Sequence, residues 1–303
     1  MSRTTQPSDA LLRFGLRANA VFSTACAVGL LLKAPTLSLH LAVDAWVLRS
    51  LALALLGFAV FLVVQAGRRT LRLFEAAMTS LGDFMWVVGS LVFVGLWSGL
   101  TGFGTALVAG VAAGVGLLGM VQILGLRKLT REPDETRGTR QRFELRHVVQ
   151  APPAAMWEVI SDLGGIERYS DDLTETFLRA GAAPGVGAVR ECANVRGQRW
   201  AERCVAFQPP TSLELEYHAD EPGFPFPMRR LQGGWGLEPL GLEATAIRVW
   251  WSFTANLPGT GTLIAAVMSE SLRRSFPRML ERMGEDAAQR AGRTCSLQEE
   301  HRV

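Results

Sequence analysis

The chain has 303 residues, enough for two domains, because a domain usually holds about 100 to 200 residues. Hydrophobic residues make up 49% of it and charged residues only 19%, and the mean hydropathy of +0.19 is too high for a typical soluble or disordered protein. The net charge of +3 arises in residues 1–126, whereas the rest carries nearly equal numbers of acidic and basic side chains. With no basic face for phosphates, nucleic acid is not an expected partner.

Residues 1–126 contain four apolar segments that predict membrane-spanning helices, each of which needs about 20 mainly apolar residues. Residues 84–126 hold no charge, and as one helix they would be about 65 Å long, roughly twice the thickness of the hydrocarbon core. We therefore expect a turn in the glycine-rich segment 98–104. The predicted spans are residues 11–33, 46–66, 80–100 and 105–126.

The first span is the shortest, since only residues 18–32 are uncharged between Arg17 and Lys33. A cleaved signal peptide has the same basic start and short apolar run, and it remains the alternative, although no small-x-small cleavage site follows Leu32. Snorkelling of the flanking basic side chains extends the segment to a full span. The prediction is therefore an all-α four-helix membrane bundle.

Basic residues predict the orientation of this bundle. Twelve lie before or at the start of the first span, between the second and third, or just after the fourth, whereas the opposite side has only Lys33 and Arg49. Basic residues concentrate on the cytoplasmic side of membrane proteins. We therefore expect an integral protein of the bacterial plasma (inner) membrane with both termini in the cytoplasm.

Polar and small residues inside the spans suggest how the helices pack. Asp83 is costly in lipid, so it is expected either to relay protons or ions or to pair across the bundle with Asn19 or a hydroxyl group. Glycine pairs at 95/99 and 110/114 favour close helix approach, within one chain or between two copies. Membrane lipid and a second copy of the chain are therefore expected partners.

The sequence after the bundle predicts a charged linker at 127–141, a folded domain at 142–290 and a polar, frayed tail at 291–303. A helix is expected from Pro153, and a long helix over about 262–290 is expected to kink at Pro277. Seven alternating runs bounded by turn signals predict an antiparallel sheet. They are residues 143–149, 173–180, 188–196, 199–207, 212–218, 231–240 and 244–256.

Several short motifs occur along this half in a familiar order. They are Val149-x-Ala151-Pro152, Trp157-x-x-Ile160-Ser161-Asp162, Ile166-Glu167-x-Tyr169, Gly185-x-Gly187, Gly197-x-x-Trp200-x-Glu202-Arg203 and Pro209-Pro210-x-x-Leu213. In this order they resemble the START-like or SRPBCC superfamily, in its polyketide cyclase/dehydrase and lipid-transport branch. The resemblance implies an α+β helix-grip domain, in which a curved antiparallel sheet holds a long C-terminal helix and encloses a cavity for hydrophobic ligands.

Strand alternation indicates which side chains face that cavity. The candidate lining residues are Tyr169, Leu215, Tyr217, Trp235, Val249, Trp251 and Phe253. The alternative is that these side chains fill the interior as solid core. Arg190 and Glu202 are candidate polar groups in the cavity, because adjacent strands can place them on one face, although cross-strand ion pairs are commoner on the surface.

Chemistry is less evident from the sequence. The four cysteines lack metal-site spacing, so neither a metal nor a cofactor is expected, and no catalytic residue is assigned. Polar residues considered for catalysis are Arg190, Glu191, Trp200, Glu202, Arg203, Tyr217 and His218. The proline-rich segment 222–227 is a lid, a membrane-touching edge or a rigid turn.

These observations leave three hypotheses for the function. The first is a membrane-anchored module that takes up or presents a lipid, quinone or other hydrophobic small molecule at the cytoplasmic leaflet. The second is a cyclase, aromatase or dehydratase acting on a lipophilic substrate, which requires polar groups that converge in the cavity. The third is a structural or partner-binding membrane protein with a filled core.

Overall fold

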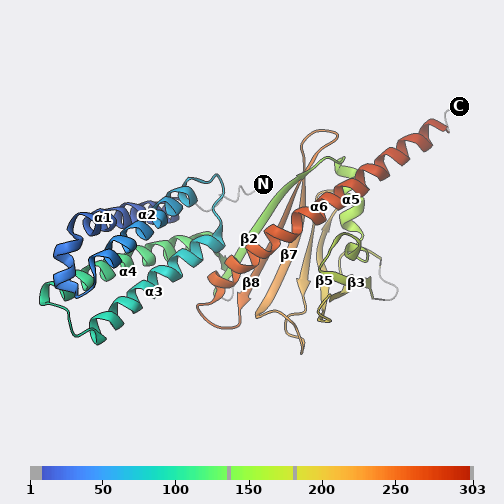
Figure 1. Ribbon diagram of the computed structural model, residues 1–303. Coiled ribbons are helices and arrows are strands. Elements are labelled where there is room, and N and C mark those ends of the chain that lie inside the picture. Colours follow the sequence, from blue (N-terminus) through green and yellow to red (C-terminus); the bar gives the residue numbers. More distant parts are fainter. Residues whose placement is uncertain (1–8, 135–137, 180–182, 301–303) are drawn as a thin grey trace. The chain divides into compact units, whose positions relative to one another are not determined.

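The computed structural model describes residues 9–134, 138–179 and 183–300, whose elements are shown in Figure 1. The chain divides into two compact units, with the boundary between Thr130 and Arg131. The first unit is made of helices, and the second combines a sheet with helices.

The N-terminal unit contains four helices that are long and apolar enough to cross a membrane. They are α1 (Ala10–Leu41), α2 (Ala45–Gly67), α3 (Leu73–Leu96) and α4 (Gly102–Thr130). The predicted first span ends at Lys33, whereas α1 continues through Pro35 to Leu41. Proline removes one helical hydrogen bond, and burial of Ala34 and Leu41 against α2 compensates for that loss.

Helix α1 packs against α2 and α4, and α3 packs against α4. Glycines on α4 allow the closest approaches to α1. A Cβ atom at Gly114 would lie 2.7 Å from Cζ of Phe22, and one at Gly125 would lie 2.7 Å from Cα of Leu12. The glycine pairs predicted at 95/99 and 110/114 therefore contribute only in part to close helix packing. An added Cβ would meet nothing within 4 Å at Gly95 and Gly110.

Hydrogen bonds join the helices at both ends of the unit. Arg13 on α1 donates from Nη1 to the carbonyl oxygens of Ala66, at 2.6 Å, and Arg68, at 2.7 Å, at the end of α2. A cation suits this place, because the last carbonyls of a helix lack intrahelical donors. At the opposite end, the Thr101 amide donates to the His40 carbonyl oxygen at 3.0 Å.

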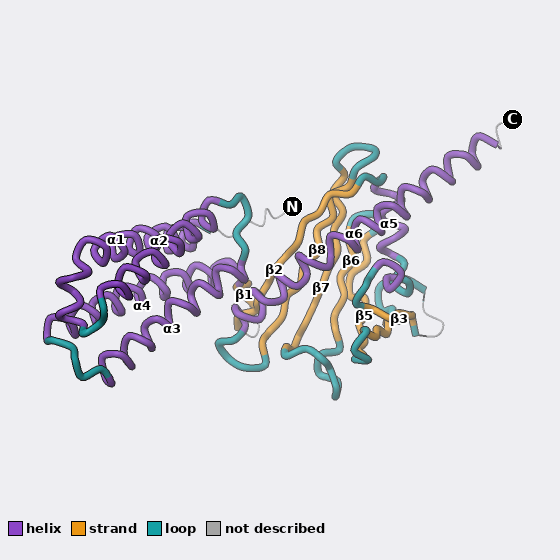
Figure 2. Tube along the Cα trace, viewed as in Figure 1, coloured by secondary structure: helices purple, strands orange, loops and turns teal. Residues whose placement is uncertain are grey.

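The C-terminal unit has one antiparallel sheet in the order β1-β2-β8-β7-β6-β5-β4-β3. Its strands stand side by side in Figure 2. They are β1 (Arg131–Asp134), β2 (Gly138–Val149), β3 (Leu173–Leu178), β4 (Val189–Asn194), β5 (Arg199–Gln208), β6 (Ser212–Tyr217), β7 (Met228–Pro239) and β8 (Thr245–Ala255).

The sheet has eight strands rather than the predicted seven. The additional strand, β1, and the start of β2 lie in the segment expected to be a charged linker. Polar contacts hold β1 in place, because Glu132 accepts hydrogen bonds from Arg142 Nη1 at 3.2 Å and from Ser252 Oγ at 2.9 Å. The charges that suggested a linker therefore pair across strands.

Three further helical segments complete this unit: α5 (Pro153–Ser161), the 3₁₀ turn η1 (Ile166–Tyr169) and α6 (Gly261–Glu300). Helix α6 crosses the sheet in front of β2, β8 and β7, which is the helix-grip arrangement (Figure 1). It includes Pro277 and continues to Glu300, through much of the predicted tail. The core lies between the sheet, α5 and α6, with Met156, Ile247, Phe253 and Leu280 fully buried.

Candidate functional site

A polar cluster lies on the inner face of the sheet, within the apolar core. Strand register aligns Arg190 on β4 with Glu202 on β5, and Glu202 in turn with Tyr217 on β6. Arg190 donates to Oε2 of Glu202 from Nε at 2.8 Å and from Nη2 at 2.6 Å. Both residues are buried, with exposed fractions of 6% and 2%. The prediction that they share one face is therefore correct, and the pair is internal rather than on the surface.

The other oxygen of Glu202 is occupied as well. Trp200 donates from Nε1 to Oε1 at 2.7 Å, and the Cys192 thiol contacts the same oxygen at 3.7 Å. Trp200 and Cys192 are themselves register partners. Cys192 lies two residues after Arg190 on β4, and this spacing places both side chains on the inner face.

Electrostatics within the cluster are dominated by burial and by the Glu202 charge. Burial alone lowers the pKa of the Arg190 guanidinium, but the adjacent Glu202 carboxylate outweighs this effect and raises it. Burial and the same carboxylate raise the pKa of the Cys192 thiol and of the Tyr217 hydroxyl. At neutral pH the cluster therefore contains a charged guanidinium, a protonated thiol and a protonated phenol.

One nitrogen of the buried Arg190 guanidinium takes no part in the pairing with Glu202. Nε and Nη2 of Arg190 are both directed to Glu202, and the described residues provide no hydrogen-bond partner for Nη1. A guanidinium has five N–H donors, and Nη1 of Arg190 is not one of the fully buried atoms that lack a partner, so it remains accessible. Arg190 can therefore offer a charged hydrogen-bond donor to a group on the inner face.

Aromatic side chains form an apolar wall on the same inner face. Trp251 on β8 stacks on Phe143 of β2 with ring centroids 5.4 Å apart, and it meets Phe276 of α6 edge-on at 5.0 Å. Trp235 on β7 also contacts Phe276, at 6.2 Å. Phe276 therefore connects the helix to both tryptophans, a role that the sequence analysis did not assign.

The predicted lining residues all belong to one hydrophobic cluster or pack against it. Leu215, Trp235, Val249, Trp251 and Phe253 are buried members, and Tyr217 is partly buried beside them. Tyr169 differs, because its hydroxyl donates to Asp286 of α6. This contact and burial raise the pKa of Tyr169 to about 12, with burial as the larger cause.

The polar residues considered for catalysis divide into two groups. Arg190, Trp200, Glu202 and Tyr217 converge on the inner face. The others lie apart from this cluster: Glu191 pairs with Arg179, Arg203 is exposed, and His218 pairs with Glu221. No cluster of three metal-ligating side chains was found in the parts of the chain that the structure describes.

The proline-rich segment 222–227 lies beside the polar cluster. Phe226 contacts Trp200 edge-on with ring centroids 5.4 Å apart, and Phe224 contacts Phe226 at the same distance. Both phenylalanines pack against the core cluster. The segment therefore adds two aromatic side chains next to the residue that donates to Glu202.

The family comparison concerns the same half of the chain. Residues 140–287 match the family model described as polyketide cyclase / dehydrase and lipid transport. This match confirms the resemblance predicted from the short motifs. No curated protein matches the chain.

Several solved structures are similar to the C-terminal half. The Zhui aromatase/cyclase from a Streptomyces species is 19% identical, with 50% of this chain and 96% of that chain covered and a TM-score of 0.40. A START superfamily protein from Mycobacterium smegmatis is 14% identical, with coverage of 48% and 97% and a TM-score of 0.40. The di-domain aromatase/cyclase BexL is 15% identical with a TM-score of 0.40, and the match spans only 46% of its length.

Proposed function

We propose, from the match of the C-terminal half to the polyketide cyclase/dehydrase and lipid-transport family model, that this protein is a membrane-anchored binding module for a hydrophobic small molecule. The ligand is a lipid, quinone or similar molecule with an apolar body and an oxygen acceptor. It lies on the inner face of the sheet, against the aromatic wall formed by Phe143, Trp235, Trp251 and Phe276.

The observation that carries this proposal is the buried Arg190 guanidinium with an unused N–H group at Nη1. Burying a charge is costly even when it is paired, and a solid apolar core needs no such group. A ligand carbonyl, hydroxyl or carboxylate that accepts from Nη1 completes the hydrogen bonding of Arg190. The aromatic side chains then contribute most of the binding free energy through burial of the apolar body.

The same geometry favours binding over catalysis. Each oxygen of Glu202 already accepts hydrogen bonds, two from Arg190 on Oε2 and one from Trp200 on Oε1. A carboxylate whose two oxygens are both engaged by donors of the protein is poorly placed to exchange a proton with a substrate. We therefore assign Glu202 the role of orienting Arg190.

Membrane anchoring gives this module its location. The four apolar helices support insertion, and the basic residues support an orientation with both termini in the cytoplasm, in a bacterial inner membrane. Poorly soluble ligands concentrate in the bilayer, so a binding domain attached to it meets them at high local concentration.

The test is retention of a ligand by the full-length protein. The protein is purified from membranes in mild detergent, and native mass spectrometry with solvent extraction identifies any small molecule that remains bound. The test variant carries Arg190→Met and Glu202→Leu, which removes the buried pair at similar volume. The matched control carries Arg146→Met and Glu238→Leu, because that pair also joins two strands of the sheet but is exposed.

We expect the wild type and the control variant to retain an apolar molecule with an oxygen acceptor, and the buried-pair variant to retain at least about tenfold less, since a charged hydrogen bond contributes about 1.5 to 3 kcal/mol. Equal retention by the two variants would show that Arg190 does not bind the ligand. A wild-type protein that retains no small molecule would favour the structural hypothesis.

A further inference from the structure

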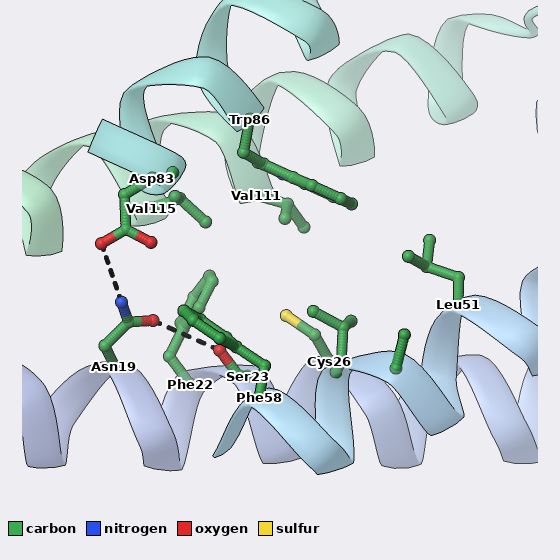
Figure 3. Close-up of a pocket in the computed structure, with 13 residues that line it drawn as sticks. Asn19, Phe22, Ser23, Cys26, Leu51, Phe58, Asp83, Trp86, Val111 and Val115 are labelled. Atoms are coloured by element: carbon green, nitrogen blue, oxygen red, sulfur yellow. Dashed lines mark hydrogen bonds between the residues drawn. The ribbon is translucent and has the colours of Figure 1, made fainter. Parts of the chain in front are cut away.

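The membrane unit contains a cavity of its own, separate from the site in the sheet. It has a volume of about 280 Å³ and is bordered by side chains from all four helices (Figure 3). Most of these side chains are apolar, including Leu51, Phe58 and Val115.

The polar residues of the bundle gather at one side of this cavity. Asp83, which is 4% exposed, accepts hydrogen bonds from Asn19 Nδ2 at 2.9 Å and from Gln122 Nε2 at 2.7 Å. Ser23 donates to Oδ1 of Asn19 at 3.2 Å. The predicted pairing of Asp83 with Asn19 across the bundle is therefore correct, and Gln122 is an additional donor.

Both donors bind the same oxygen of Asp83. Asn19 and Gln122 are directed to Oδ2, and no hydrogen-bond partner for Oδ1 occurs among the described residues. Asp83 lines the cavity, and Figure 3 shows its second oxygen turned away from Asn19, toward the other lining side chains. A carboxyl oxygen without a partner in apolar surroundings is costly, so its position next to a cavity indicates a missing polar group.

We propose that this cavity binds an amphipathic molecule with a single hydroxyl group and a short apolar chain, with the hydroxyl at Asp83 Oδ1. A hydroxyl satisfies this oxygen in either state, because it donates to a carboxylate and accepts from a carboxylic acid. The apolar chain extends past Trp86 and Cys26, which also line the cavity. A lipid tail fills the same space but leaves Oδ1 without a partner.

The experiment uses the full-length protein in nanodiscs of dimyristoylphosphatidylcholine and a decyl alcohol with a diazirine on its chain. After irradiation, mass spectrometry measures cross-linking of the peptides that contain Cys26 and Trp86. Unlabelled 1-decanol and decane compete separately. We expect decanol to suppress cross-linking at about tenfold lower concentration than decane, the ratio that one hydrogen bond of about 1.4 kcal/mol provides.

Glycines on α3 supply a matched pair of variants. Gly82 lines the cavity and Gly89 does not, and an added Cβ would meet nothing within 4 Å at either position. Gly82→Leu is expected to reduce cross-linking at least about tenfold because its side chain takes up ligand space, whereas Gly89→Leu leaves it unchanged. Both replacements are expected to preserve the helix, since leucine is a better helix former than glycine.

Asp83→Leu tests the polar contact directly. In this variant decanol and decane are expected to compete equally well, while the peptides that contain Cys26 and Trp86 still cross-link. Two results would overturn the proposal: equal competition by decanol and decane in the wild type, which indicates a groove for lipid tails, or equal cross-linking of the Gly82→Leu and Gly89→Leu variants. If Asp83→Leu does not fold, these two comparisons still decide the question.

Discussion

Arg190 and Glu202 show how a buried ion pair differs from an exposed one. The pair lies inside the hydrophobic core, with exposed fractions of 6% and 2%. Desolvation of two charges offsets much of their attraction, so the pair contributes little net stability, but the loss of one partner leaves an uncompensated buried charge. The two charges are therefore strongly coupled.

A double-mutant cycle measures this coupling. Arg190→Met is expected to destabilise the sheet by about 3 to 5 kcal/mol, because Glu202 remains buried without its cation. Adding Glu202→Leu is expected to recover most of this loss and to leave about 1 kcal/mol, because Trp200 then lacks an acceptor. Hydrogen exchange of β4 and β5 amides in the full-length protein measures the free energy of opening. If Arg190→Met alone lowered the stability as little as the double variant does, the two charges would not be coupled.

Strand alternation was sufficient to predict that Arg190 and Glu202 share a face, because β4 and β5 form an adjacent antiparallel pair. Alternation does not specify side-chain rotamers. The hydrogen bond from Trp200 to Glu202 and the edge contact between Trp251 and Phe276 depend on rotamers and on the position of α6. These two contacts could therefore not be predicted from the sequence and are known only from the structure.

Helix α6 lies close to the sheet at Gly284, where an added Cβ would lie 2.9 Å from Cβ of Val149 on β2. A β-carbon cannot occupy that position unless the helix or the strand shifts. The lack of a side chain at this position therefore sets the distance between α6 and β2.

Two glycine variants in α6 separate packing from helix propensity. Gly284→Ala is expected to destabilise the helix by about 1 to 2 kcal/mol, because overpacking outweighs the propensity gain of about 1 kcal/mol. Gly292→Ala, where an added Cβ meets nothing within 4 Å, is expected to stabilise it by about 0.5 kcal/mol. Hydrogen exchange of α6 amides provides the measurement. Stabilisation by Gly284→Ala would contradict the close approach.

Glu270 makes the stability of α6 dependent on pH. Arg273 donates to it at 2.9 and 2.8 Å and Arg274 at 2.8 Å, and these bonds, with Arg273 the larger cause, lower its pKa from 4.5 to about 2. A lowered pKa in the folded state stabilises the protein above pH 4.5, and this contribution disappears as the pH falls toward about 2. The shift corresponds to about 3 kcal/mol, but the exposed arginines reduce the expected effect to about 1 kcal/mol.

We therefore expect Glu270→Gln to lower stability by about 1 kcal/mol at neutral pH and by progressively less as the medium is acidified from about pH 4.5. Thermal unfolding of the full-length protein is followed by circular dichroism between about pH 7 and pH 3. It measures the difference in stability between the variant and the wild type. Glu243→Gln, in the exposed turn after β7, is the control. A stability difference that stays constant with pH would show that Glu270 does not act through its charge.

Hydrophobic periodicity predicted the seven longer strands and the long C-terminal helix, because burial of one face dictates the period of such an element. The lengths of the apolar runs predicted the four helices that are long enough to cross a membrane. β1 was missed because Arg131–Asp134 is short and charged, and its pairing depends on the distant Ser252. The extension of α1 past Pro35 was missed for a similar reason, since packing against α2 overrides the local effect of proline.

Charged side chains are placed differently in the two units of the chain. In the membrane unit, basic residues collect at the helix ends, where Arg68 and Arg72 pair with Glu75 and Arg13 caps α2. In the other unit, opposite charges pair across strands and along α6. The proposed orientation therefore rests on the basic residues of the first unit.

Cysteine labelling of intact cells tests this orientation. In the Thr101→Cys variant, an impermeant maleimide added outside is expected to react, because residue 101 lies in the connection between α3 and α4. In the Arg203→Cys variant, at an exposed position of β5, reaction is expected only after the cells are permeabilised. Reaction of the Arg203→Cys variant in intact cells would refute a cytoplasmic grip domain.

The sheet is open, and among the described strands each of the two outer ones, β1 and β3, pairs with one neighbour only. Such edges can recruit a strand from another molecule, which is a common route to aggregation. Confinement to a membrane would raise that risk, since neighbouring copies meet in two dimensions. Both edges are short, with four and six residues, and Pro133 removes an amide donor from β1. These short edges therefore offer little backbone to a strand of a neighbouring copy.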